Sequence, residues 1–348
     1  MTQSPWPANT PHSATMMSLA SFPIPAELAG QTLAGVLRQR LPGQSWAQVR
    51  RLIETRRAKV NGELCRDPAR RLKEGETVEL LARPGAPPRQ RETLVIRHLD
   101  EHVIVVEKPS GICTVRHPSE RAWTERRKAL SPTLEDLVPP LIAAREGRLR
   151  KGPLPRLRVV QRLDKETSGL VVFARTVSAE RGLGQQFHAH TVTRRYLAVV
   201  PGRVRPQRIQ THLIRDRGDG RRGSTSLPGA GKEAITHVDV VERLPRYTLL
   251  ACRLETGRTH QIRIHLAELG HPVCGDHVYN HKPDGTVWPD LSGAPRLALH
   301  AAELGFRHPV TGEELYWSMP LPADLQAFLE QLRSSGRGRS NHADQVDR

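Results

Sequence analysis

Cysteine is scarce in this sequence, and its few copies lie far apart. No two of them form a CxxC pair; they are Cys65, Cys113, Cys252 and Cys274. Neither a structural zinc site nor a disulfide framework is indicated, and a reduced, cytoplasmic protein is predicted. The apolar patch at 16–23 has no basic region before it, which argues against a secretory signal.

Several motifs that carry chemistry are also absent from the sequence. It contains no glycine-rich phosphate loop, no GxGxxG after a strand and no HExxH, so redox and phosphoryl-transfer reactions and a nucleotide cofactor are not expected. An alternative metal site would use His260, His265 and His271. These histidines are spaced by five and six residues and no carboxylate completes the set, whereas helical ligands usually pair at i, i+4, so no metal is predicted.

Positive charge is abundant. The 348 residues include 53 Lys and Arg against 36 Asp and Glu, a formal net charge of +17 that is spread along the chain. This balance favours a polyanionic partner, although a compositional bias in a solvated surface would give the same count. A lipid surface also attracts cations, but no long apolar span and no obvious basic amphipathic helix is present. Nucleic acid is the expected partner, and no membrane partner is expected.

The chain is long enough for one large domain or two modest ones. Composition predicts disordered tails at 1–25 and 334–348, a small module at 26–82, a Pro- and Arg-rich linker at 83–91 and a catalytic domain at 92–333. Residues 113–155 match no pattern beyond a possible helix at 134–143, and are interpreted as an inserted loop region that could contact the substrate.

The small module has the pattern of two helices and a hairpin. Leu33, Val36 and Leu37 recur at helical spacing, and Ser45 can cap a second helix after the break at Pro42-Gly43. AKVNGEL then predicts a strand and turn, and 75–82 a closing strand. The basic face expected on the second helix comprises Arg50, Arg51, Arg56 and Arg57. A charged face is often only solvated, so RNA binding by these arginines is a hypothesis.

The remainder contains many strand-like runs, with helices expected near 178–190, 258–270 and 322–332. The prediction is an α+β domain with a central, mainly antiparallel sheet. On the helix at 258–270, Ile262, Leu266 and Leu269 are expected to form a buried stripe, which leaves His260 and Arg263 on another face.

The densest polar pattern lies at 156–175, RLRVVQRLDKETSGLVVFAR. Asp164 falls between two apolar, strand-like segments, and the turn Thr167-Ser168-Gly169 follows it. Arg162 precedes it by two residues, so a short bend is expected to present a carboxylate and a cation to one ligand. The alternative is a surface turn with an ion pair.

This block resembles the RluA-type pseudouridine synthases, whose nucleophile motif reads His-Arg-Leu-Asp followed by Thr-Ser-Gly. Gln161 stands in place of that His. The resemblance extends over roughly 90–325. Further matching motifs are VVEKPSG at 105–111, RRYLAVV at 194–200, TGRTHQIRIH at 256–265, Gly275-Asp276 with Tyr279, and 296–314. The segment RLIETRRAKVNGELCRDPARRLKEGE similarly resembles the S-four-type (alpha-L) RNA-binding domain.

The resemblance implies a pseudouridine synthase fold and the isomerisation of uridine to pseudouridine in structured RNA without a cofactor. It assigns Asp164 as nucleophile or base, Arg263 as its ionic partner, Tyr196 as the ring that stacks on uracil, and Arg162 as the side chain serving the flipped-out nucleotide. Gln161 can still form hydrogen bonds but cannot titrate near neutral pH. Activity is nevertheless expected, because the other matched residues are present.

Large-subunit ribosomal RNA is the expected substrate, because family members with the appended module typically act there; transfer RNA is the alternative. A monomer is expected. Two other classes stay open at this point. One is a non-catalytic RNA-binding or ribosome-assembly factor with a degenerate enzyme domain, and the other is a nucleoside or glycosidic-bond hydrolase, which should act without structured RNA.

Overall fold

The computed structural model describes residues 18–82, 94–148, 152–218, 220–281 and 286–335. Within these residues the chain forms two compact units. The first contains the described residues up to Ala82 together with Trp123–Ser131, and the second contains the rest. The helices described are too short or too polar to cross a lipid bilayer.

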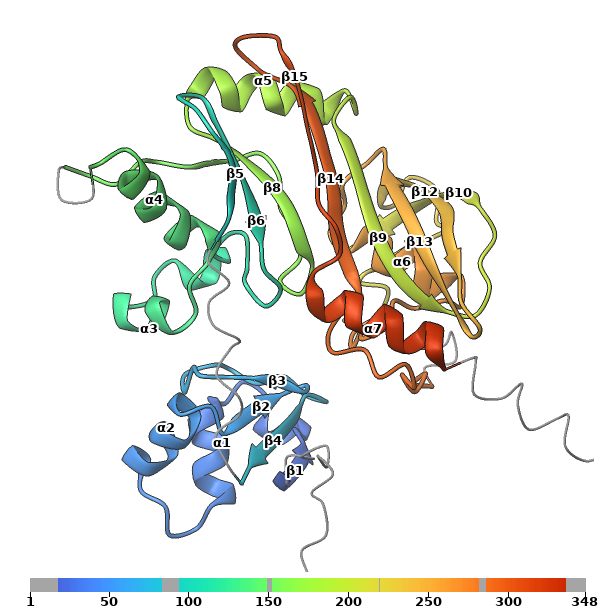
Figure 1. Ribbon diagram of the computed structural model, residues 1–348. Helices are drawn as coiled ribbons and strands as arrows, with labels where there is room; N and C mark the ends of the chain where they lie inside the picture. Colours follow the sequence, from blue (N-terminus) through green and yellow to red (C-terminus); the bar gives the residue numbers. More distant parts are fainter. Residues whose placement is uncertain (1–17, 83–93, 149–151, 219, 282–285, 336–348) are drawn as a thin grey trace, which may run out of the picture. The chain divides into compact units, whose positions relative to one another are not determined.

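The first unit is a small sheet covered by two helices (Figure 1). Its strands lie in the order β1-β4-β2-β3. Its elements are β1 (Ser18–Pro23), η1 (Ala26–Leu28), α1 (Leu33–Arg40), α2 (Trp46–Glu54), β2 (Ala58–Val60), β3 (Glu63–Leu64), β4 (Thr77–Leu81) and α3 (Glu125–Leu130). Ser45 caps α2, as predicted, and it also forms a capping box with Gln48. Asn61 and Gly62, both at positive φ, make the turn between β2 and β3.

One expected tail is wrong in part. Residues 18–23 were assigned to a disordered segment by composition, but they form β1, which pairs antiparallel with β4 and places Phe22 opposite Val78. Ile24, which follows, is fully buried in the core of the unit. The strand is stabilised by pairing with β4. The composition of residues 18–23 does not show that this partner is available. Residues 1–17, the predicted linker at 83–91 and 336–348 lie outside the described residues.

The predicted inserted loop region is wrong in part. The helix expected at 134–143 is present as α4 (Leu134–Arg145), but the range also contains η2 (Pro118–Glu120) and α3, and Trp123–Ser131 belongs to the first unit. A bidentate ion pair joins this segment to the rest of the unit. The Arg127 guanidinium donates from Nε to Asp67 Oδ1 at 3.1 Å and from Nη2 to Asp67 Oδ2 at 2.7 Å. Arg127 also lies over the Trp123 ring, 3.7 Å from its centroid. A charge pair between positions 60 residues apart leaves no local signal in the sequence.

The second unit is built on a large, mainly antiparallel sheet, as predicted. In the described residues its strands follow the order β11-β10-β12-β13-β9-β14-β8-β6-β5, with β15 beside β14 and β7 beside β8. Figure 1 traces the sheet from β5 to β10. The strands are β5 (Ile96–Leu99), β6 (Val103–Lys108), β7 (Arg158–Val159), β8 (Ser168–Ala174), β9 (Thr193–Pro201), β10 (Gln207–Ile214), β11 (Gly223–Thr225), β12 (Lys232–Arg243), β13 (Tyr247–Leu254), β14 (Leu299–Arg307) and β15 (Glu314–Ser318). The pairing of β8 with β14 is parallel.

Helices cover both faces of this sheet. They are α4 (Leu134–Arg145), α5 (Val177–His188), α6 (Gln261–Glu268) and α7 (Ala323–Ser334), and η2 (Pro118–Glu120) is a short 3₁₀ turn with no buried residue. Strand β6 is apolar along its length because both of its faces are covered. Ile104 and Val106 pack in the core that also contains side chains of α4, α6 and α7. Val103 and Val105 point to the opposite face and pack with α5. Successive side chains of a strand alternate between faces, so a strand covered on both faces needs apolar residues throughout.

Helix α6 differs from the predicted amphipathic stripe. Leu269, expected in the buried stripe, is 36% exposed, whereas Arg263 and His265 are buried along with Ile262 and Leu266. The helix contacts β12 and has no solvated face in its central turns. Its polar side chains are therefore directed into the protein, where each needs a partner.

Candidate active site

The loop that carries Asp164 connects β7 to β8 and is clamped by the segment after β6. The fully buried Lys108 ammonium donates to the carbonyl of Lys165 at 2.8 Å and to two carbonyls of its own turn. The Ser110 hydroxyl donates to the carbonyl of Glu166 at 2.7 Å. Burial lowers the pKa of Lys108 to about 7, and the negative charge of Glu166 opposes that shift. The VVEKPSG motif thus fixes the backbone of the two residues that follow the candidate nucleophile.

Two further contacts hold the ends of the same loop. The Thr114 hydroxyl accepts from the Leu163 backbone N–H at 3.0 Å and donates to the Leu163 carbonyl at 2.9 Å. At the other end, Gly169 has φ of +122°, and a Cβ there would come within 2.2 Å of the Ala301 carbonyl oxygen on β14. Glycine is required at this position, because β8 passes directly against β14 as it leaves the site.

The Asp164 carboxylate lies beside Arg263, as predicted for the pair. Arg263 Nη1 is 3.4 Å from Asp164 Oδ2, and the Asp164 side chain is 21% exposed, so a ligand can reach it. A second carboxylate holds Arg263 more closely: Nε donates to Asp276 Oδ2 at 2.7 Å and Nη2 to Asp276 Oδ1 at 2.9 Å. Burial lowers the pKa of Arg263, but its hydrogen bonds to Asp276 outweigh this and the pKa is raised.

Asp276 itself is fixed by the backbone around it. Its side chain has no exposed surface, and Oδ1 also accepts from the N–H groups of Val278 and Tyr279. Burial raises the pKa of Asp276, and the hydrogen bond from Arg263 reverses the shift so that the pKa is lowered. A buried, ionised aspartate that accepts hydrogen bonds from Arg263 and from two backbone N–H groups holds Arg263 rigidly.

Tyr196 lies on β9 between Cys252 of β13 and Ala301 of β14 and is only 7% exposed. Burial raises the pKa of its phenol; Arg194 lowers that pKa, and the negative charge of Asp164 raises it further. Tyr196 is therefore a protonated phenol, and it lies near enough to Asp164 for the charge of that carboxylate to raise its pKa.

Gln161 is buried next to Tyr196. Its Oε1 accepts from the Val172 backbone N–H at 3.4 Å, which leaves the amide N–H₂ group to face elsewhere. That group forms a hydrogen bond that lowers the pKa of Tyr196 against the effect of burial. Gln161 thus supports both β8 and the phenol, and it does so without a titratable ring.

Arg162 is exposed on the loop beside Asp164. It is therefore accessible from solvent, in contrast to the buried Arg263. Exposure alternates along the loop: Gln161 and Leu163 are buried, while Arg162 is exposed and Asp164 is partly exposed. The bend thus leaves both the cation and the carboxylate accessible.

The four arginines proposed for the first unit are not on one helix face. Helix α2 ends at Glu54, and Arg56 adopts a left-handed conformation with φ of 66° just beyond it. Arg50 and Arg51 are exposed on the helix. Arg57 is turned inward, where its Nε donates to the Leu81 carbonyl at 3.0 Å and its Nη2 to the Ala82 carbonyl at 2.8 Å. The sequence missed this break because Thr55 and Arg56 carry no strong stop signal.

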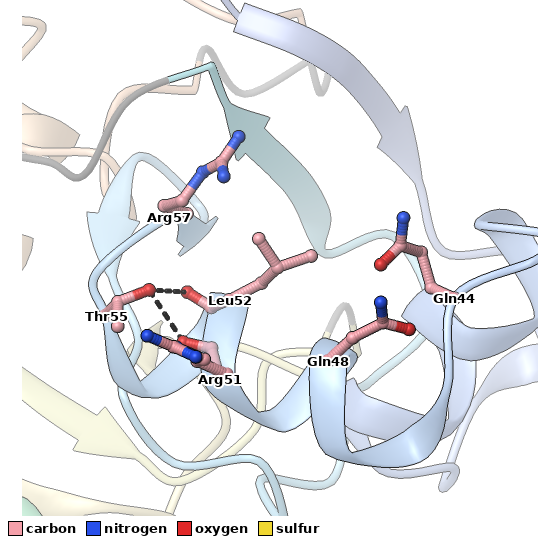
Figure 2. Close-up of a pocket in the computed structure, with 6 residues that line it drawn as sticks. All are labelled: Gln44, Gln48, Arg51, Leu52, Thr55 and Arg57. Carbon is pink, nitrogen blue, oxygen red and sulfur yellow. Dashed lines mark hydrogen bonds between the residues drawn. The ribbon is translucent and has the colours of Figure 1, made fainter.

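A shallow cavity of about 210 Å³ lies at the end of α2 (Figure 2). Two guanidinium groups, two amides and one apolar side chain contribute to its lining, which comprises Gln44, Gln48, Arg51, Leu52, Thr55 and Arg57. The Thr55 hydroxyl donates to the Arg51 carbonyl at 2.6 Å and closes the last turn of the helix. The first unit therefore offers a polar, cationic hollow beside its exposed arginines.

Among the described residues, no group of three or more His, Cys, Asp or Glu is arranged to hold a metal ion. His265, part of the alternative metal set, is instead held by two hydroxyls, those of Thr236 and Thr211, each at 2.9 Å.

Several residues of the site were not identified from the sequence. Asp276, Tyr279 and Lys108 lie in motifs that match the family, but the resemblance assigns none of them a role. His260 was considered for a metal and then set aside; it lies at the start of α6 with Nε2 3.9 Å from Asp164 Oδ1. The usable signal was present: charged and polar residues in a buried helix and a buried strand end require partners inside the protein.

Comparison with known proteins gives the same class. A family profile described as RNA pseudouridylate synthase matches residues 102–268, and an S4 domain profile matches 32–78. The chain is 38% identical to the "Ribosomal large subunit pseudouridine synthase D" of Xanthomonas campestris pv. campestris, over 91% of this chain and 93% of the relative. The protein of the same name from Nitrosomonas europaea is 35% identical, over 89% of this chain and 87% of the relative.

The fold agrees with a solved structure as well. The "Human RNA Pseudouridylate Synthase Domain Containing 4" superimposes with a TM-score of 0.53 at 23% identity, covering 68% of this chain and 92% of that one. The fold, the buried Arg263 beside Asp164, and these relatives define an RNA-modifying isomerase with an appended S4 domain. The chain belongs to the RNA pseudouridine synthase family, and its reaction converts uridine in RNA to pseudouridine.

Proposed function

We propose that the protein isomerises one or a few specific uridines of large-subunit ribosomal RNA, with Asp164 as the reacting group. The observation that carries this proposal is the mounting of Arg263: two of its nitrogens are bound to Asp276, and a third is directed at Asp164. A fixed cation beside one partly exposed carboxylate orients that carboxylate through a charge-assisted contact. The ribosomal RNA substrate is inferred from the names of the relatives, and the S4 match supports RNA binding.

In the proposed reaction the N1–C1′ bond of the uridine breaks, the uracil turns and a C5–C1′ bond forms. The proton on C5 then leaves and N1 gains a proton, so no atom is lost and nothing is oxidised. Asp164 starts cleavage as nucleophile at C1′ or as base on the sugar. Tyr196 stacks on the freed uracil and keeps its orientation. This balance needs no cofactor, and we propose that none is used.

The target uridine has to leave its helix before Asp164 can reach the sugar. Arg162 is exposed next to Asp164, and we assign it to the RNA strand from which the nucleotide is extruded. The first unit provides affinity through Arg50, Arg51 and Arg56, with the phosphate backbone as their target. We propose a cytoplasmic monomer with an RNA-binding unit at 18–82 that is completed by 123–131, and a catalytic domain formed by the rest of 92–335.

Pseudouridine mapping across total ribosomal and transfer RNA tests this function. Cells that lack the gene are compared with cells restored by the wild type or by Asp164→Asn. Loss of one or a few large-subunit sites, restored by the wild type alone, supports the proposal. Loss confined to transfer RNA would replace the substrate but keep the chemistry, and an unchanged map would favour a non-catalytic RNA-binding role.

A further inference from the structure

His260 is a polar residue of the site that the reaction above does not use. It precedes α6 as its N-cap in a left-handed conformation, with φ of 59° and ψ of 19°. Residues with a Cβ rarely adopt this conformation, and outliers of this kind concentrate at functional sites. The backbone holds the imidazole between Asp164 and Tyr279, with Nε2 toward the first and Nδ1 toward the second.

The two oxygens of the Asp164 carboxylate have different neighbours. Oδ2 is 3.4 Å from Arg263 Nη1, whose guanidinium is itself fixed by Asp276. Oδ1 has His260 Nε2 at 3.9 Å, which is longer than a hydrogen bond. Oδ2 is thus engaged by a rigid cation, while the lone pairs of Oδ1 are free to react next to a nitrogen that is close but not bonded.

Tyr279 determines which nitrogen of His260 carries the hydrogen. Its hydroxyl lies 2.7 Å from His260 Nδ1. Burial raises the pKa of Tyr279 to about 12, so the phenol keeps its proton and can donate it. Burial lowers the pKa of His260; the charges that face it are those of Asp164 and Asp276, which raise this pKa, and of Arg263 and Arg222, which lower it.

The imidazole is therefore neutral at pH 7, with one hydrogen to place. A bare lone pair on Nε2 would face the carboxylate of Asp164, whereas an N–H there is attracted to it. The favoured arrangement has Tyr279 donating to Nδ1 and the hydrogen on Nε2 directed at Oδ1.

We propose that His260, oriented by Tyr279, is a positioning residue that presents an N–H to Oδ1 of Asp164 and so makes Oδ1 the reacting oxygen. This inference rests on the proposed function. If Asp164 acts as nucleophile, Oδ1 bonds to C1′ as the N1–C1′ bond breaks. When C5 then attacks C1′, the Oδ1–C1′ bond breaks and its electron pair returns to Oδ1, where the N–H stabilises it. His260 transfers no proton in this role.

The test uses the full-length protein and a large-subunit ribosomal RNA transcript, with kcat, KM and thermal unfolding measured for each variant. Glycine adopts the left-handed conformation more readily than histidine, so His260→Gly keeps the backbone role and removes the N–H. We expect kcat to fall about tenfold to a hundredfold, with KM within about twofold of wild type and no loss of Tm.

His260→Gln, whose amide can supply an N–H at a similar reach, should recover most of that loss. Tyr279→Phe should lower kcat by less than His260→Gly and introduce a dependence of kcat on pH between about 5 and 7, because Nδ1 then lacks the hydroxyl hydrogen and can take up a proton. His277→Gln is the matched control: His277 is exposed one residue from Asp276 and should leave all parameters unchanged.

Wild-type kcat in His260→Gly would overturn the proposal. Equal losses in the glycine and glutamine variants, together with a lower Tm or a raised KM, would assign His260 a structural role and overturn it as well. Failure of the proposed function itself is distinguishable, because the wild-type protein would then form no pseudouridine in the transcript.

Discussion

Arg263 binds Asp276 through Nε and Nη2, and its third nitrogen, Nη1, faces Asp164. The Asp276 contacts are 2.7 and 2.9 Å, and the Asp164 contact is 3.4 Å. The buried pair is therefore Arg263 with Asp276, and the partly exposed Asp164 is supported by it without being tied to it. A nucleophile needs this combination, because it has to be oriented and still be able to approach the ribose.

Asp276→Asn should destabilise the protein by about 3–5 kcal/mol, since removing one partner of a buried ion pair leaves the other charge uncompensated. Activity should fall too, because Arg263 loses its mount. Urea unfolding with the activity assay measures both. Asp164→Asn is the matched control, which keeps the Arg263–Asp276 pair and should unfold close to wild type. Equal stability of the wild type and Asp276→Asn would show that the pair is not what holds Arg263.

Gln161→Leu should lower both stability and kcat, since the Val172 N–H and the Tyr196 phenol both lose a partner in a buried setting. The expected cost in stability is about 1–3 kcal/mol. Gln161→His can keep these hydrogen bonds, so its kcat at pH 8 should stay close to wild type, with a decline at lower pH as the ring is protonated. Steady-state rates from pH 5.5 to 8.5 measure this, and a leucine variant with wild-type rates would remove Gln161 from the site.

Acid should destabilise the second unit through two buried histidines. Burial lowers the pKa of His265 to about 4, and burial with the charge of Arg296 lowers the pKa of His300 to about 4. An unfolded histidine titrates near 6.5, so the unfolded chain binds more protons between pH 6.5 and 4 and stability falls as pH falls. Each histidine contributes about 3 kcal/mol over that window.

The measurement is the free energy of unfolding from pH 7 to 4, by denaturant titration. His265→Gln removes one titrating group and should give a shallower fall than the wild type, whatever its stability at pH 7. An unchanged slope in this variant would mean that His265 is protonated in the folded protein at the same pH as in the unfolded chain.

The arginines of the first unit should separate by position. Replacing Arg50 and Arg51, which are exposed on α2, with Gln should weaken RNA binding and reduce the slope of log K against log salt by about 0.7–0.9 per lost phosphate contact. Arg57→Gln should instead lower stability, because its guanidinium holds the carbonyls of Leu81 and Ala82. Binding isotherms at several salt concentrations test this, and an unchanged slope for the double variant would exclude Arg50 and Arg51 from the RNA interface.

The sequence predicted what local patterns carry. The α+β class, the antiparallel sheet and the helix cap at Ser45 follow from periodicity and end signals, and Asp164 with Arg263 follows from motifs. Strand β1 and the placement of Trp123–Ser131 depend on pairings between residues that lie far apart in the sequence. Arg263 and Asp276 are only 13 residues apart, but the sequence between them does not show that their side chains meet, so these features required the fold.

The most direct test of the central claim is a single-turnover reaction of purified protein with a ribosomal RNA transcript labelled with tritium at carbon five of uridine, because the C5 proton is released only if pseudouridine forms. We predict that the wild type releases tritium and that Asp164→Asn, folded and binding RNA with wild-type affinity, releases none. Release by Asp164→Asn at the wild-type rate would contradict the assignment of Asp164 as the reacting group.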